Sequence, residues 1–156
     1  MLRRGLTAAG LVIAAVVLMA GGRGGAAGHT TAAHSCTALD KQFVKAASLS
    51  STSIMLLGQD YSAGDVEPKD AIYETQQAMI GIDITDPQDA SLKLVKSLMH
   101  GMFVEYGRAI RAQWKGKGDP GEHMYRSYSL ANYAHQVLLQ AQPGLEAKGC
   151  PLADLL

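Results

Sequence analysis

The sequence lacks the short motifs by which many hydrolases, kinases and metalloproteases are recognised. It contains no HExxH zinc motif, no GxSxG nucleophile turn and no glycine-rich phosphate loop. None of its glutamates, at positions 67, 74, 105, 122 and 146, is followed three residues later by a histidine. This excludes the Glu-x-x-His pattern of helical bundles with carboxylate di-metal centres. We therefore expect a protein without catalytic function.

A net charge is also missing, because 14 Lys and Arg residues balance 14 Asp and Glu residues. The balance hides an acidic first part, with nine acidic residues against three lysines in 37–90. Residues 91–126 are basic, with seven basic residues against three acidic ones. Three arginines, Arg3, Arg4 and Arg23, lie within the first 28 residues, so the remainder of the chain is slightly acidic. Such a charge excludes nucleic acid as a general partner.

A long apolar run occurs only at the N-terminus. Arg3 and Arg4 precede residues 5–22, a stretch of 18 residues without a charge. Positive charges before an apolar run are typical of an export signal, and the run is slightly shorter than the ~20 residues that cross a bilayer core. We expect residues 1–28 to form a cleaved signal peptide or, alternatively, a retained N-terminal membrane anchor.

The expected export signal also sets the expected division of the chain into segments. Residues 29–35 are interpreted as a flexible linker and residues 36–156 as one helical domain. The protein is then secreted or otherwise extracytoplasmic, or it is held at the cell membrane by its single N-terminal segment. Membrane association through that segment is part of this second alternative.

Cysteine is scarce, and Cys36 and Cys150 stand near the two ends of the expected domain. Outside the cytoplasm an even number of cysteines is expected to pair. A bridge between them would close nearly the whole domain into one loop, for which chain entropy predicts about 4–5 kcal/mol of stabilisation. Two free buried thiols are the alternative.

Apolar residues recur at three- and four-residue steps in four segments, which predicts helices. The first begins at Thr37, with Asp40 as its reciprocal capping partner, and is expected to end at Gly58. The second begins at Pro68. Gly81 lies within "IGIDI", which alternates like a strand, and leaves the end of this second helix open.

The third segment carries the most regular apolar seam. Thr85 is expected to cap it, and the seam runs through Leu92, Val95, Met99, Met102, Tyr106 and Ala109 or Ile110. The fourth segment begins at Asp119 and Pro120 and is expected to end at 142–144, with the tail lying back across the domain. Together these segments predict an all-α fold, a single small bundle of about four helices clamped by one disulfide.

Soft metal ligands gather in the third segment, where Met99, His100 and Met102 lie within four positions. Thioether and imidazole groups together suit Cu(I). The two methionines share one helix face, but His100 is turned about 100° from Met99. Because both methionines also continue the seam, core packing is the main interpretation and a copper site is the alternative.

A second group lies on the fourth segment, where Tyr128 and His135 are two turns apart on one side. Tyrosine and histidine both serve as axial ligands of haem, and a methionine-rich pocket suits the macrocycle. The simpler interpretation is a boundary tyrosine with a wet hydroxyl and a histidine bonded to a carbonyl. The candidate ligand set for haem or copper is thus Tyr128, His135, Met99 and Met102.

The layout of two cysteines in an exported, all-helical chain resembles the small haemophore-like proteins secreted by mycobacteria. In both, a cysteine near the mature N-terminus is balanced by another near the C-terminus. The resemblance covers the architecture, and no ligand motif is carried over with it. It implies extracytoplasmic haem binding as an expectation.

Two functions are therefore expected. The first is that of an exported, non-catalytic helical protein acting as a binding or cell-envelope-associated accessory protein. Its partner would be an unknown protein or a small hydrophobic ligand. The alternative is an extracytoplasmic carrier of haem or copper.

Overall fold

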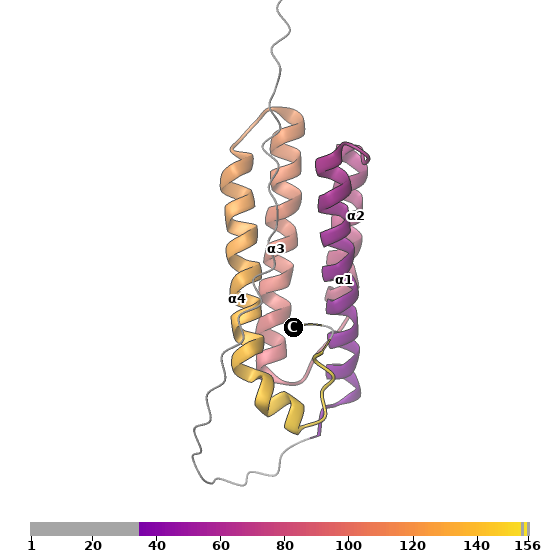
Figure 1. Ribbon diagram of the computed structural model, residues 1–156, viewed down its shortest axis with the longest axis vertical. Coiled ribbons are helices and arrows are strands. Elements are labelled where there is room, and N and C mark those ends of the chain that lie inside the picture. Colours follow the sequence, from indigo (N-terminus) through magenta and orange to yellow (C-terminus); the bar gives the residue numbers. More distant parts are fainter. Residues whose placement is uncertain (1–34, 154, 156) are drawn as a thin grey trace, which may run out of the picture. The chain divides into compact units, whose positions relative to one another are not determined.

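The computed structural model describes residues 35–153 and 155. The expected signal segment and most of the expected linker lie outside these residues. The described part contains no strand and folds into four helices, which Figure 1 labels α1 (Ala38–Ala63), α2 (Pro68–Asp83), α3 (Ala90–Lys115) and α4 (Pro120–Ala147). The prediction of an all-α bundle of four helices is confirmed. None of the described helices has the length and hydropathy needed to span a bilayer.

The helices pack in sequence order and do not close into a ring. α1 packs against α2, α2 against α3 and α3 against α4, while α1 touches α3 only slightly. α1 and α4 do not pack against each other, and Figure 1 shows them on separate pairs of helices. One flank of the bundle, between α1 and α4, is therefore left without helix–helix packing.

The core is centred on α3, the helix with which all the others are in contact. The predicted seam of α3 is the buried face, with Leu92, Val95 and Met99 buried and Met102 half-buried. The other helices and the tail complete this core with buried apolar side chains, among them Phe43, Ala47, Ile82, Ala134, Leu138 and Leu152.

Three of the predicted helix starts are confirmed. Thr37 and Asp40 form a reciprocal capping box at α1, Pro68 occupies the first turn of α2 and Asp119 caps α4. The predicted Thr85 cap of α3 is wrong, because Asp89 caps this helix by accepting from the Ser91 N–H at 2.9 Å. The buried Thr85 hydroxyl instead donates to the Ile82 carbonyl at 2.5 Å, next to the last turn of α2.

The predicted ends of the first and fourth helices are also wrong. α1 continues through Gly58, where a Cβ would lie 3.3 Å from the Tyr106 hydroxyl, so this glycine permits a close approach to α3. α1 ends instead at Gly64, with a φ of 85° in the left-handed region that glycine favours. α4 continues through Pro143 to Ala147, and its last turns bend away from the rest of the helix in Figure 1.

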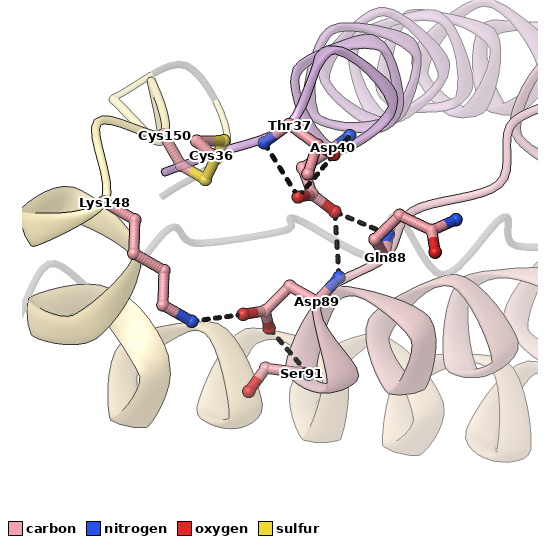
Figure 2. Close-up of a disulfide and its surroundings, with 8 residues drawn as sticks. All are labelled: Cys36, Thr37, Asp40, Gln88, Asp89, Ser91, Lys148 and Cys150. Atoms are coloured by element: carbon pink, nitrogen blue, oxygen red, sulfur yellow. Dashed lines mark hydrogen bonds and ion pairs between the residues drawn. A yellow bond between two sulfur atoms is a disulfide. The ribbon is translucent and has the colours of Figure 1, made fainter. Parts of the chain in front are cut away.

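This bend brings the C-terminal end of α4 to the start of α1, where the disulfide forms (Figure 2). Cys36 and Cys150 are bonded across a sequence separation of 114 residues, and both are buried. The Cys36 N–H also donates to the Lys148 carbonyl at 2.7 Å. The predicted pairing is confirmed, and it indicates an oxidising, extracytoplasmic environment.

Beside the disulfide, the buried carboxylate of Asp40 joins the starts of α1 and α3 (Figure 2). It accepts from the Thr37 N–H and hydroxyl at 3.1 and 2.7 Å. It also accepts from the N–H groups of Gln88 and Asp89 at 2.6 and 2.9 Å. Asp89 in turn binds the Lys148 ammonium at 2.7 Å. One carboxylate and one ion pair thus connect α1, α3 and the end of α4.

These contacts act on the pKa of Asp40 in opposite directions. Burial acts to raise this pKa, while hydrogen bonds from the Asp89 N–H, Thr37 and the Gln88 N–H lower it. The hydrogen bonds outweigh burial, so the pKa of Asp40 lies below its ordinary value of 3.8. The carboxylate is therefore charged in the folded protein at neutral pH.

Removing the disulfide by the paired substitutions Cys36→Ser and Cys150→Ser is expected to lower the free energy of unfolding by about 4–5 kcal/mol. The reason is the chain entropy that a loop of this length regains when the protein unfolds. Urea denaturation of the oxidised protein and the double variant measures the difference. Alkylation of both cysteines in the native protein without a reductant would contradict the bridge itself.

Asp40→Asn is expected to lower the free energy of unfolding by about 2 kcal/mol at pH 7, because a charge-assisted buried acceptor is lost. A carboxylate with a depressed folded pKa stabilises the protein above its unfolded pKa and loses this effect as the pH falls through the folded value. The difference between wild type and Asp40→Asn should therefore shrink below about pH 4. Urea denaturation from pH 7 to pH 2 measures this, with the exposed Asp60→Asn as control. A difference that is independent of pH would contradict the assignment.

Candidate functional site

The unpacked flank between α1 and α4 contains a cavity of about 190 Å³. We call it the α1–α4 groove. Its floor is the seam of α3, its walls come from α1 and α4, and Leu155 of the C-terminal tail contributes to it. Its lining residues are Ser51, Val95, Met99, Met102, Ala131, Ala134, His135, Leu138 and Leu155.

The sequence of α1 explains why this side stays open. The stretch "SLSSTS" places small polar residues along α1, and Ser51 is the residue of α1 that lines the groove. Ser50, one residue earlier, is buried and donates its hydroxyl to the Ala78 carbonyl at 3.0 Å. This bond holds α1 on α2, while Ser51 offers α4 no apolar surface to pack against.

The wall formed by α4 is kept in place by close contacts with α3. The Ser127 hydroxyl donates to the Met102 carbonyl at 3.0 Å. A Cβ on Gly101 would lie 3.1 Å from Leu130, so the missing side chain lets the two helices approach closely. The small side chains of Ala131 and Ala134 then leave room beside the floor. The α4 side of the groove is therefore tightly positioned against its floor.

Three of the four candidate ligands lie on this groove. Met99 is buried, with 5% of its surface exposed, and Met102 is half-buried one turn further along α3. His135 reaches the same cavity from α4 and is half-buried. Its ring has no hydrogen-bond partner among the described residues. The groove thus combines two thioethers and one unpartnered imidazole on an apolar surface.

The fourth candidate, Tyr128, is not part of the lining. Its side chain is 66% exposed, and Tyr125 and Tyr133 are exposed as well. Tyr128 and His135 therefore lie on the same side of α4, two turns apart, but in different surroundings. The histidine lies in the groove, and the tyrosine lies in solvent.

His100, the histidine nearest to the methionines in sequence, also lies outside the groove. It is exposed, and its Nδ1 is 3.0 Å from both carboxylate oxygens of Asp83. The turn of about 100° between His100 and Met99 thus places His100 at the surface of α3. The imidazole that accompanies Met99 and Met102 is that of His135.

A buried carboxylate paired with a half-buried histidine, which sequence reasoning missed, lies between α3 and the first turn of α4. Glu105 is buried, its carboxylate is 2.7 Å from Nδ1 of His123, and it accepts from the Arg108 guanidinium at 2.6 Å. The pKa of Glu105 is lowered, chiefly by the hydrogen bond with His123. Burial acts to raise this pKa, and the Arg108 guanidinium lowers it further. The residues are 18 positions apart, so a search for Glu-x-x-His does not find them. They stabilise the packing of α4 on α3.

The acidic part of the sequence gathers in a second hollow, at the turn between α1 and α2. Five carboxylates border it, together with Leu56, Leu57 and Val66; they belong to Asp60, Asp65, Glu67, Asp70 and Glu74. No group of three or more His, Cys, Asp or Glu residues in the described part of the chain is placed to hold a metal ion.

Comparison of this chain with protein-family models, with curated proteins and with solved structures finds no match. The chemistry of the α1–α4 groove is therefore the basis for the functional argument.

Met99→Ala is expected to lower the free energy of unfolding by about 2–5 kcal/mol, as other truncations of buried methionines do. Met102→Ala should cost less, because Met102 is half-buried at the open side of the core. Urea denaturation of the metal-free protein measures both values. Equal and near-neutral effects of the two substitutions would contradict the packing of Met99 in the core.

Proposed function

We propose that the protein is an exported, non-catalytic binding or cell-envelope-associated accessory protein, and that the α1–α4 groove is its binding surface. The observation that supports this is the cavity that borders the buried floor of the groove. Met99 and Val95 belong to the core seam of α3. In a closed four-helix bundle, contact between α1 and α4 would cover this seam. Here α1 and α4 stay apart, and the seam borders a cavity.

The chemistry of the lining favours an apolar occupant. Apart from Ser51 and His135, the lining side chains are aliphatic or carry a thioether. Burial of apolar surface contributes about 25 cal/mol per Å², and methionine side chains adapt to irregular partners. A volume of about 190 Å³ lies below the roughly 300–1,000 Å³ of drug-sized ligand pockets. The occupant is accordingly a small hydrophobic molecule or one apolar side chain of a partner protein.

Export is the second part of the proposal. The charged and apolar N-terminal segment is typical of a signal peptide, and the Cys36–Cys150 bridge fits an oxidising compartment. A cleaved segment gives a secreted protein, and a retained one gives a protein tethered to the membrane. In both cases the groove belongs to a domain outside the cytoplasm.

An extracytoplasmic carrier of haem or copper is the second candidate. It is favoured by the convergence of Met99, Met102 and His135 on one groove. Haem is the less suitable cargo, because its macrocycle is larger than the cavity and would require α1 and α4 to separate. Tyr128, the other expected axial ligand, lies outside the lining. A single soft metal ion requires no such separation.

Filling the groove by Ala131→Trp is expected to abolish the binding of a small apolar probe. Benzene suits this purpose, since apolar cavities of about 150 Å³ bind it. With ¹³C-methyl-labelled methionine, benzene should shift the signals of Met99 and Met102 in the wild type and leave them unshifted in Ala131→Trp.

Asn132→Trp is the matched control, because it adds the same ring at an exposed neighbouring position of α4 outside the lining. It should bind benzene as the wild type does. Absence of a benzene-induced shift in the wild type, or its persistence in Ala131→Trp, would contradict the proposed role of the groove.

A further inference from the structure

We propose that the α1–α4 groove is a binding site for a soft monovalent cation, Cu(I), held by the thioether sulfurs of Met99 and Met102 and by the imidazole of His135. This inference rests on the proposed function of the groove as a binding surface, and it deepens the second candidate function by naming the ion and its ligands. Thioether sulfur and imidazole nitrogen are the donor types that favour copper.

The first support is the placement of the donors on two helices that are fixed to each other. Met99 and Met102 are three residues apart, so their side chains lie on one face of α3. His135 faces the same cavity from α4. The Ser127 bond to the Met102 carbonyl and the close approach at Gly101 set the position of α4 beside these methionines. The donors therefore come from packed helices and not from loops.

The second support is that the donors are free to bind. The His135 ring has no hydrogen-bond partner among the described residues. The other two described histidines are each engaged by a carboxylate, His100 by Asp83 and His123 by Glu105. A half-buried imidazole without a partner keeps a nitrogen lone pair available for a metal in its neutral form.

The third support is the charge of the groove, which selects against divalent ions. No Asp, Glu, Lys or Arg residue is among the lining residues, so the two thioethers and the imidazole form a neutral donor set. A divalent ion would bring two uncompensated charges into a largely apolar cavity, which is costly. Cu(I) brings one charge, and its preference for sulfur compensates for the absence of a carboxylate.

The test uses the full chain with its disulfide intact and Ag(I) as a redox-inert substitute for Cu(I). Ag(I) needs no reductant, so the Cys36–Cys150 bridge is preserved. The N-terminal histidines His29 and His34 lie outside the described residues and are replaced by alanine in all samples, so that they cannot take up metal. ¹³C-methyl methionine spectra are recorded during the titration, and Cu(I) binding is then measured by competition with a coloured Cu(I) chelator.

One equivalent of Ag(I) is expected to shift the methyl signals of Met99 and Met102 and leave that of Met79 in place. Met99→Leu, Met102→Leu and His135→Gln should each weaken Cu(I) binding at least about tenfold, since each removes one direct ligand. These replacements nearly conserve volume and should preserve the fold. Met79→Leu and His100→Gln are the matched controls outside the groove, and they should bind as the parent protein does.

Each contrary result has a definite meaning. Uptake that is unchanged in the three ligand variants would place the metal elsewhere and overturn the proposal. No uptake by a parent protein whose Met99 and Met102 signals still respond to benzene would overturn the copper site and leave the proposed function intact. A Soret shift with hemin that His135→Gln abolishes, without uptake of Ag(I), would overturn it in favour of haem. If a variant fails to fold, as judged by circular dichroism, the Ag(I)-induced shifts of Met99 and Met102 in the parent protein decide whether the site exists.

Discussion

The structure depends on the junction at which three helix ends are fastened together. The Cys36–Cys150 bridge joins the start of α1 to the chain just beyond α4, and the Asp40 carboxylate joins the start of α1 to that of α3. Lys148 connects the end of α4 to Asp89. Because this end of the bundle is closed by a covalent bond and a buried anion, α1 and α4 need not pack along their length. Closure at one end thus permits the groove to stay open.

The helices and several of their starts could be predicted from the sequence because local interactions determine them. A capping threonine with its reciprocal aspartate, or a proline after an aspartate, acts within a single turn. The failures occur where a neighbour distant in sequence decides the outcome. Gly58 does not end α1, since its missing side chain accommodates Tyr106, and Thr85 is buried against the last turn of α2 and does not cap α3. Pro143 bends α4 without ending it.

The candidate site could be predicted only in part for the same reason. Helical periodicity places Met99 and Met102 on one face and His135 on a face of another helix. It does not tell which faces meet, so the nearby His100 was the natural partner to consider for the methionines. The pairing of Glu105 with His123 depends on the register of α4 along α3, which no pattern within one helix contains. Tertiary packing therefore removes Tyr128 from the candidate ligand set and keeps Met99, Met102 and His135.

Leaving the groove open has a cost in stability, and this cost bears on function. A closed bundle would bury Met102 and His135 further, at about 25 cal/mol for each Å² of apolar surface. Replacing Ser51 by a large aliphatic residue would be a simple route to such packing. The chain instead has a polar α1 wall, small residues on α4 and an imidazole without a partner. The disulfide, with an expected contribution of about 4–5 kcal/mol, supplies stability that does not depend on contact between α1 and α4. A bundle stabilised in this way can keep part of its core seam accessible to a ligand.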